Sequence, residues 1–493
     1  MTAILAIDQG TTGTTALVLG PDGALLGRGY VPIRQQFPEP GWVEHDPEEL
    51  FRSTVEAGRA ALERAGVRPA ALGLTNQRET VVLWDRRTLA PVAPAIVWQD
   101  RRTAARCREL RDAGHEAAVR ARTGIVLDPY FSATKIEWLL RDPELRRRAG
   151  RGELAAGTVD AWLVARLTEG RVHATDPTNA SRTLLYDLDA RDWSDDLLRL
   201  FGIPRELLPA LVPSCGVLGE AGRAHFGVAL PVAGLAGDQQ AALFGQACTE
   251  PGQSKNTYGT GAFLLVQAGG TRPAAAPGVL VTAACGPGGG PSYALEGSVF
   301  IAGAAVQWLR DGLGLVASAE ETEALARGVP DTGGVHFVPA FVGLGTPHWE
   351  PEARGTITGL TRGTTRAHLV RAALEAMAFS TADLLGAMAA GAGLDVPALR
   401  VDGGAAANDW MMQFQADVLG VPIERPALVE TTALGAGFLA GIGVGLWREP
   451  AEVLGRVGGV RFEPRIGAEE RARLRAGWER AVAAALHWAR DAG

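Results

Sequence analysis

The segment Asp8-Gln9-Gly10-Thr11-Thr12-Gly13-Thr14-Thr15 has the residue types of a phosphate-binding turn. Glycines let the backbone bend tightly and turn its N–H groups into a concavity, and the threonine hydroxyls add donors. Asp8, at the end of an apolar run, offers the kind of carboxylate that holds Mg²⁺, often through bound water. A plain hairpin turn would have similar residues, so this segment alone leaves both interpretations open.

An adjacent Arg78 and Glu79 follow the apolar run Ala71 to Thr75, and a second polar cluster, Gln99 to Arg102, lies downstream. Together an Arg and a Glu provide donors and acceptors, which a polyol needs because each hydroxyl both donates and accepts. The pair predicts a polyol site. A surface ion pair is the alternative.

Two further segments combine a carboxylate with small residues: Gly237-Asp238-Gln239-Gln240 and Asp402-Gly403-Gly404-Ala405. Asp238 has a side chain able to accept a proton, although Asp is also a preferred helix N-cap. The small residues after Asp402 would let a flat adenine approach the backbone. They fit the tight start of a helix equally well.

The elements that must position these residues follow from hydrophobic periodicity. The first three predicted strands form a meander: Ala3 to Asp8, Thr14 to Leu19 and Ala24 to Ile33. A helix is predicted from Pro47 to Gly66 with Asp46 as its N-cap. A strand from Ala71 to Thr75 follows, and residues 100–230 are predicted to be mainly helical.

The pattern restarts near Gly237. Asn256 to Gln267 resembles the opening turn and its strand, a long amphipathic helix is predicted from about His368 to Gly391, and a strand covers Leu399 to Val401. A chain of 493 residues also exceeds the roughly 250 to 300 residues at which one core stops growing. We therefore predict an α/β protein with two domains, residues 1–247 and 248–493.

Composition excludes several classes of function. The 48 basic and 55 acidic residues give a net charge of −7, so no overall attraction to nucleic acid or anionic membrane is expected. Only Lys135 and Lys255 are lysines, and neither lies in the Gly-Lys-Ser/Thr sequence of a Walker A loop. The four cysteines are far apart, without the spacing of a thiolate zinc site.

The chain also lacks the patterns of export and membrane insertion. Its first residues have no basic region of a signal peptide. The longest apolar stretch, Ala433 to Trp447, is below the ~20 residues needed to span a bilayer. We expect a cytoplasmic protein without membrane insertion, in which this stretch forms a buried, closely packed helix.

Ordered motifs cover essentially the whole length and identify a resemblance. They are Asp8 to Thr12, Pro40 to Pro47, Thr75 to Thr80, Ile96 to Thr103, Asp128 to Ser132, Gly157 to Asp160, Thr178 to Thr183, Gly237 to Gln246, Lys255 to Gly261, Ala294 to Gly297, Phe337 to Phe341, Val401 to Ala405 and Val429 to Gly435. With these motifs in this order, the chain resembles the FGGY carbohydrate kinase family. Within that family, it is most similar to the members that phosphorylate glycerol. The resemblance implies two actin-like ATPase (ribonuclease H-like) domains facing a central cleft, with ATP bridging both.

The resemblance also implies roles for individual residues. Asp238 would be the general base that accepts the proton of the attacking hydroxyl. Glycerol would contact Arg78, Glu79, Trp98, Tyr130, Asp238, Gln239 and Phe263. ATP would contact Thr11, Thr12, Gly13, Thr260, Gly303, Gln307, Gly404 and Asn408. Asp8 would serve the Mg²⁺ ion.

Two departures from the family pattern affect these expectations. Many relatives carry Arg at the position of Thr15, where it would neutralise charge on the phosphoryl group. Some relatives bind the inhibitor fructose 1,6-bisphosphate with a Gly-Gly-Thr-Arg loop, which the segment from Gly222 to Pro231 lacks. The sequence therefore predicts an enzyme that escapes this inhibition.

Other functions remain as alternatives. Another sugar kinase of the family, such as a xylulokinase, would share the phosphate and adenosine motifs, but Arg78-Glu79 with Trp98 and Phe263 favours glycerol. A non-catalytic ATP-driven module of the same fold would lack the polyol pocket. By resemblance, a homodimer or homotetramer is expected.

Overall fold

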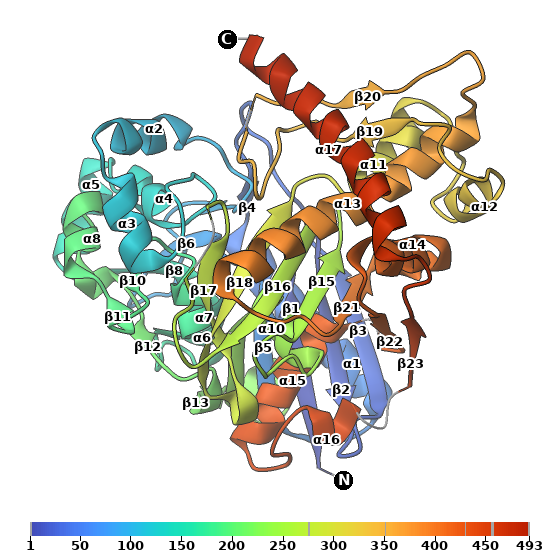
Figure 1. The fold of residues 1–493 in the computed structure, drawn as a ribbon. Coiled ribbons are helices and arrows are strands. Elements are labelled where there is room, and N and C mark those ends of the chain that lie inside the picture. Colours follow the sequence, from blue (N-terminus) through green and yellow to red (C-terminus); the bar gives the residue numbers. More distant parts are fainter. Residues whose placement is uncertain (1, 275–276, 351, 429, 455–457, 492–493) are drawn as a thin grey trace.

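Two mixed β-sheets with matching topology form the framework of the protein (Figure 1). The computed structural model describes residues 2–274, 277–350, 352–428, 430–454 and 458–491. The first sheet has six strands in the order β13-β14-β5-β1-β2-β3. They are β1 (Ala3–Gln9), β2 (Gly13–Leu19), β3 (Leu25–Pro32), β5 (Pro69–Asn76), β13 (Cys215–Ala221) and β14 (Leu230–Gly237).

The predicted meander is confirmed, because β1 pairs antiparallel with β2 and β2 with β3. The predicted helix is α1 (Pro47–Ala65), which packs on this sheet. It begins where the Asp46 carboxylate accepts the N–H of Glu48, and it ends at Gly66, whose φ of 62° lies in the left-handed region that glycine tolerates. These local signals set the bounds of the elements that lead into the site.

The second sheet has seven strands in the order β17-β18-β16-β15-β21-β22-β23. They are β15 (Ser254–Tyr258), β16 (Ala262–Gly269), β17 (Leu280–Cys285), β18 (Pro291–Val299), β21 (Leu399–Gly403), β22 (Ile423–Pro426) and β23 (Gly459–Phe462). β15, β16 and β18 are antiparallel neighbours, whereas β15, β21 and β22 are parallel. The strands β1, β2, β3, β5 and β14 repeat this arrangement, so the restart predicted near Gly237 corresponds to a second copy of one topology.

Smaller sheets and helices complete the chain. The remaining strands are β4 (Glu44–His45), β6 (Val81–Asp85), β7 (Ala95–Ile96), β8 (Leu154–Thr158), β9 (Ala174–Thr175), β10 (Tyr186–Asp187), β11 (Asp192–Trp193), β12 (Ala210–Leu211), β19 (His336–Val338) and β20 (Thr356–Thr358). The first helices are α2 (Ala104–Asp112), α3 (Glu116–Thr123), α4 (Ala133–Leu139), α5 (Pro143–Gly150), α6 (Val159–Leu167), α7 (Pro177–Ala180), α8 (Asp195–Phe201), α9 (Arg223–Phe226) and α10 (Asp238–Gly245). The later ones are α11 (Gly303–Gln307), α12 (Glu321–Arg327), α13 (Arg366–Ala392), α14 (Asp409–Leu419), α15 (Thr431–Gly443), α16 (Ala451–Leu454) and α17 (Ala468–Asp491).

Much of the segment between β5 and β13 forms a helical lobe beside the first sheet, drawn from cyan to green at the left of Figure 1. The prediction of a mainly helical stretch over 100–230 holds for this lobe. It is wrong at β8, which pairs with β6 in a four-stranded sheet, and at β13, which adds an edge strand to the first sheet.

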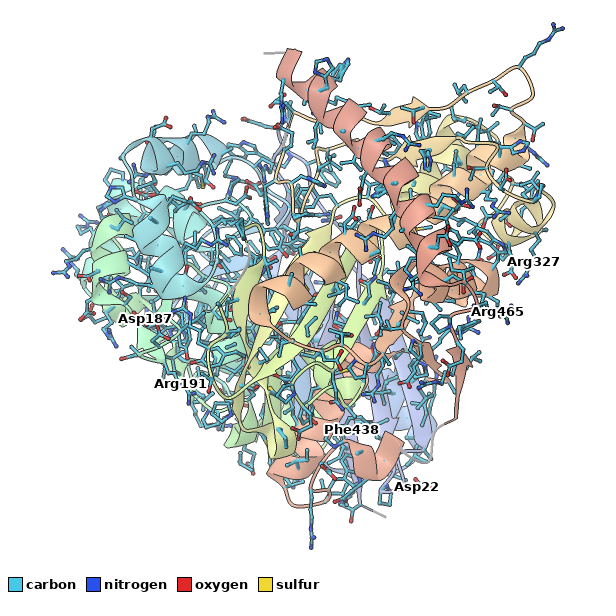
Figure 2. The ribbon with its side chains drawn as sticks, viewed as in Figure 1. Asp22, Asp187, Arg191, Arg327, Phe438 and Arg465 are labelled. Atoms are coloured by element: carbon cyan, nitrogen blue, oxygen red, sulfur yellow. The ribbon has the colours of Figure 1, made fainter. Side chains whose placement is uncertain are left out.

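Helix α15 comes from the second half of the chain but packs on β1, β5 and β14 of the first sheet and on α10. Glycines make the contact close. A Cβ added to Gly73 would lie 2.0 Å from the carbonyl oxygen of Ala436, and one added to Gly435 would lie 1.9 Å from that of Ala241. Phe438 of this helix is buried in the interior, whereas Arg327 and Arg465 lie on exposed parts of the chain (Figure 2). The expectation of a closely packed helix after Ala433 is confirmed.

Helix α13 has the length and composition of a membrane span, but 72% of its most apolar stretch is buried inside the protein. Eight consecutive residues, Ala372 to Phe379, are buried. Eight residues make more than two turns, so the burial extends around the whole helix. The predicted helix is present, but its predicted amphipathic character is wrong, because protein covers it on all sides there.

Candidate active site

Three adjacent parallel strands bring the predicted carboxylates and arginine together. β14 lies beside β5 with Gly237 opposite Asn76, and β5 lies beside β1 with Thr75 opposite Asp8. Asp238 directly follows β14, and Arg78 is the second residue after β5. Because the carboxyl ends of parallel strands meet at one edge of a sheet, Asp8, Arg78 and Asp238 converge there.

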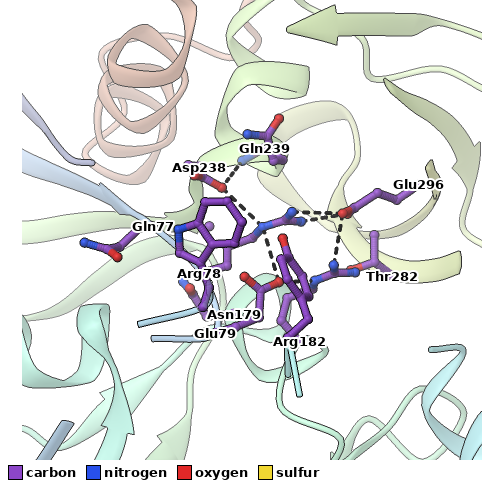
Figure 3. A network of polar contacts seen from close by, with 12 residues as sticks. Gln77, Arg78, Glu79, Asn179, Arg182, Asp238, Gln239, Thr282 and Glu296 are labelled. Carbon is purple, nitrogen blue, oxygen red and sulfur yellow. Dashed lines mark hydrogen bonds and ion pairs between the residues drawn. The ribbon is translucent and has the colours of Figure 1, made fainter. Parts of the chain in front are cut away.

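Arg78 is the centre of a buried network of charges (Figure 3). Its Nη1 lies 2.6 Å from Oε2 of Glu296, and its Nη2 lies 2.9 Å from Oε1 of the same carboxylate. Arg182 donates from Nε to Glu79 at 2.6 Å and from Nη2 to Glu296 at 3.0 Å. Two arginines and two glutamates are thus paired, and Glu296 comes from β18 of the second sheet.

These four side chains have almost no contact with solvent, since Arg78 is 2% exposed and Glu79 is 1% exposed. The alternative of a surface ion pair is therefore wrong. Burial would raise the pKa of Glu296, but Arg182 and Arg78 lower it to about 2. Glu79 has a φ of 60°, which is costly for a residue with a Cβ and requires support from its surroundings. The Ser132 hydroxyl provides some, because it donates to the Glu79 carbonyl at 2.9 Å.

Asp238 lies at the accessible side of this network. Its Oδ1 is 3.2 Å from Nε of Arg78 and accepts the backbone N–H of Gln239 at 2.7 Å. The N-cap of α10 is Gly237, so Asp238 is the first helical residue and the N-cap alternative is wrong. Burial raises the pKa of Asp238, although the charges of Arg78 and Lys255 oppose the rise. Its side chain remains 27% exposed, so a ligand can reach a carboxylate of raised proton affinity.

Three aromatic rings line the apolar side of the site. The Trp98 ring centre lies 5.5 Å from that of Tyr130 and 6.5 Å from that of Phe263, both in edge-on arrangements. Trp98 and Tyr130 come from the first half of the chain, whereas Phe263 comes from β16. Trp98 also donates from Nε1 to the Thr11 hydroxyl at 2.9 Å, which joins this side of the site to the first phosphate turn.

The two predicted phosphate turns occupy equivalent places in the two sheets. The Gly10 N–H donates to the Gly13 carbonyl between β1 and β2, and the Gly259 N–H donates to the Gly261 carbonyl between β15 and β16. Thr12 and Thr260 are exposed at these turns.

The predicted nucleotide residues of the second half gather near the second turn. Gly303 donates its N–H to the Gly259 carbonyl at 3.1 Å and begins α11, which ends at the exposed Gln307. Gly404 follows Gly403, which pairs with Tyr258 at the start of the turn. Asn408 caps α14, because its Oδ1 accepts the N–H of Met411 at 2.9 Å. A helix cap thus accounts for Asn408, and its contact with adenosine stays a prediction.

The surroundings of Asp8 fit a divalent cation. Its Oδ1 is buried without a hydrogen-bond partner, and burial together with the Asp238 charge raises the Asp8 pKa to about 8. A nearby cation would relieve both effects. The described residues contain no group of three or more His, Cys, Asp or Glu side chains arranged for a metal. One or two carboxylates together with water and phosphate oxygens are the usual ligands of Mg²⁺, and Asp8 is a carboxylate of that kind.

Sequence reasoning assigned no role to Glu296, Arg182 or Lys255. All three lie in segments that carry the family resemblance, but the pairing of Glu296 with Arg182 depends on contacts between distant parts of the chain. Lys255 is fully buried and donates to the Gln239 side chain and, at 2.9 Å, to the Thr257 hydroxyl. Burial lowers its pKa to about 8. The sequence did contain a signal, since Lys135 and Lys255 are the two lysines of an arginine-rich chain. The structure shows that both are buried near site residues.

Comparison with known proteins identifies the class. Residues 3–245 match the N-terminal domain of the FGGY family of carbohydrate kinases, and residues 254–444 match its C-terminal domain. The chain belongs to this family.

Individual relatives agree with this assignment. The chain is 56% identical over 495 residues to glycerol kinase of Alkalilimnicola ehrlichii, covering 100% of both chains. It is 34% identical to the crystal structure of Plasmodium falciparum glycerol kinase with ADP, with a TM-score of 0.93 and coverage of 99% of this chain and 98% of that one. A xylulose kinase from Rhodospirillum rubrum is 26% identical, with a TM-score of 0.88 and coverage of 99% and 100%. The predicted two-domain, actin-like ATPase fold is confirmed.

Proposed function

We propose that this chain transfers the γ-phosphoryl group of ATP to a terminal hydroxyl of glycerol, forming sn-glycerol 3-phosphate. The observation that carries the proposal is the convergence of Arg78, Glu79 and Asp238 beside Trp98 and Phe263. The charged side chains would form hydrogen bonds with the hydroxyls of glycerol, and the aromatic faces would pack against its C–H groups. Relatives named glycerol kinase that match along the whole chain support the same substrate.

In this proposal the acceptor is held by the buried network. Arg78 and Glu79 keep fixed positions because Glu296 and Arg182 hold them, so little ordering is needed when glycerol binds. Tyr130 and Gln239 contact the remaining hydroxyls, while Trp98 and Phe263 pack on the carbon chain. Such a site rejects analogues that lack a hydroxyl, because a buried polar group would be left unpaired.

Asp238 accepts the proton of the attacking hydroxyl. Its raised pKa makes it a better base than an ordinary aspartate, and its contact with Arg78 orients the carboxylate. Phosphoryl transfer has a loose transition state, so alignment and charge stabilisation supply most of the acceleration, and proton removal comes late.

The nucleotide lies across the two phosphate turns in this proposal. Thr11, Thr12 and Gly13 contact the terminal phosphates from one turn, and Thr260 contacts them from the other. The α-phosphate and adenosine lie near Gly303, Gln307, Gly404 and Asn408. Asp8 holds Mg²⁺, which neutralises phosphate charge when bound. The unpartnered Oδ1 and raised pKa of Asp8 support this assignment.

Further expectations concern the state of the protein. We place the domain boundary near residue 247, between β14 of the first sheet and β15 of the second, although α15 crosses back to the first sheet. We also propose a homodimer or homotetramer in the cytoplasm. The four free cysteines support a reducing compartment.

An ADP-release assay with glycerol, xylulose and no acceptor tests the proposal. Release that depends on glycerol and is far slower with xylulose is the expected result. A preference for xylulose would establish the xylulokinase alternative, and release independent of any acceptor would establish a plain ATPase.

A further inference from the structure

The first phosphate turn has no basic side chain of its own. Arg28 is the first Lys or Arg in the chain, so β1, the turn and β2 contain none. Arg28 itself is paired with Glu430 at 3.1 Å. Thr15, where many relatives carry Arg, is too short to replace a guanidinium. A neighbouring strand is one source of donors beyond the backbone and the threonines.

Tyr30 lies in the cross-strand row that contains Asp8. Asp8 is opposite Thr15 in the β1–β2 pair, and Thr15 is opposite Tyr30 in the β2–β3 pair. Residues directly opposite one another project from the same face of a sheet. Thr14 projects from the other face, where its hydroxyl contacts that of Ser53 on α1 at 2.8 Å. The Tyr30 side chain is thus on the face that carries Asp8.

The Tyr30 ring extends diagonally over Gly13, toward the turn. A Cβ added to Gly13 would lie 2.5 Å from the Tyr30 hydroxyl and 2.6 Å from Cε2. The φ of Gly13 lies outside the left-handed region, so space for this ring, rather than backbone conformation, requires glycine here. Tyr30 is 51% exposed, and none of the described residues pairs with its hydroxyl. A free donor therefore lies against the phosphate turn.

We propose that the Tyr30 hydroxyl donates a hydrogen bond to a terminal phosphate of ATP. This inference rests on the function proposed above. A hydrogen bond to a charged acceptor is stronger than one between neutral groups, and a tyrosine in contact with Gly13 provides it without a cation at the turn. The hydroxyl supplies binding and alignment only, and no covalent step involves it.

The variant Tyr30→Phe removes the hydroxyl and keeps the ring, so it distinguishes the contribution of the hydroxyl from that of the ring. If the ring served only to cover Gly13, as aromatic side chains do for glycines on neighbouring strands, Phe would replace it fully. If the hydroxyl binds phosphate, Tyr30→Phe lowers kcat/KM for ATP about tenfold, the low end for a hydrogen bond to a charged group. The KM for glycerol and the Tm stay at wild-type values.

Equilibrium titration with a non-hydrolysable ATP analogue and with AMP identifies the group that is bound. The analogue should bind Tyr30→Phe about tenfold more weakly than wild type, whereas AMP should bind both proteins equally. Equal weakening for AMP, or kcat/KM for ATP within twofold of wild type, overturns the inference. Wild-type turnover of glycerol is measured alongside, because its absence would refute the proposed function rather than the role of Tyr30.

Discussion

The glycerol side and the phosphate side of the site are built differently. Around Arg78, four charged side chains are buried, and each is fixed by at least two partners. At the phosphate turns, Thr12 and Thr260 are exposed, and the residues that meet there are mostly glycines and threonines. The acceptor pocket is therefore organised before substrate binds, whereas the nucleotide meets an open surface of backbone and hydroxyl groups. Substitutions should cost most on the glycerol side.

The largest expected effect is that of Asp238→Asn, which removes the proposed base and keeps its shape. The kcat for glycerol should fall at least ~10²-fold, the usual scale for a general base. Glycerol affinity should stay within an order of magnitude. Steady-state kinetics and calorimetric titration of glycerol measure the two quantities.

Asp195→Asn is a matched control, because Asp195 is also the first residue of a helix, α8, but is remote from the site. It should retain wild-type turnover. Near-normal turnover of Asp238→Asn would show that this carboxylate has no part in proton removal.

The next largest effect concerns the network that joins the two halves. Glu296→Gln keeps the volume of the side chain but removes the carboxylate that pairs with both Arg78 and Arg182. Arg182 then keeps only Glu79 as a carboxylate partner, and Arg78 keeps Glu79 and Asp238. Breaking such a buried pair should lower the free energy of unfolding by about 3 kcal/mol, and displaced arginines should raise the KM for glycerol. Denaturant unfolding at pH 7 and glycerol kinetics provide the measurements.

Glu375→Gln is the control, since Glu375 is also buried and paired with an arginine, Arg371. Burial raises the pKa of Glu375 to about 7, so its carboxylate is less fully charged at that pH than the carboxylate of Glu296. The pKa of Glu296 is about 2, below its ordinary value, so its stabilisation is present above pH 4.5 and lost as the pH falls toward 2. Equal losses for the two variants at pH 7 would contradict this difference.

A smaller effect is expected from a substitution at Trp98, where the glycerol side and the phosphate side of the site meet. Trp98→Phe removes the Nε1 donor to Thr11 and keeps an aromatic face for glycerol. Loss of about 1 kcal/mol should raise the KM for ATP roughly fivefold. Trp193→Phe loses a similar bond to the Pro209 carbonyl far from the turn, and its KM for ATP should not change. A rise in the KM for glycerol alone would show that Trp98 does not couple the turn to the pocket.

No effect is expected from fructose 1,6-bisphosphate. In the segment that lacks the Gly-Gly-Thr-Arg loop, α9 is a single short helix, and Arg59 donates to the carbonyls of Ala224 and His225, each at 2.6 Å. The guanidinium of Arg59 is therefore already occupied, and within the segment from Gly222 to Pro231 Arg223 is the one arginine. Glycerol-dependent rates measured at fixed ionic strength should stay constant into the millimolar range of the bisphosphate. A saturable fall would show that phosphate can be bound there without the loop.

The strands and turns that lead to the site could be predicted because their signals are local. Apolar runs, glycine turns and the Asp46 cap gave the meander and α1 to within a residue or two. The character of α13 and the edge strand β13 were missed, because burial on all sides and edge pairing depend on distant neighbours.

The sequence by itself determined the turn residues, the ordered family motifs and the presence of Arg78, Glu79 and Asp238. Only the tertiary structure decided that Arg78 and Glu79 are buried, that Asp238 is not a cap, and that Glu296 pairs with both arginines. Glu296 is 218 residues from Arg78 along the chain. The physical reason is that a buried charge is stable only beside a partner of opposite charge. For these residues, the packing of the two sheets places that partner in contact.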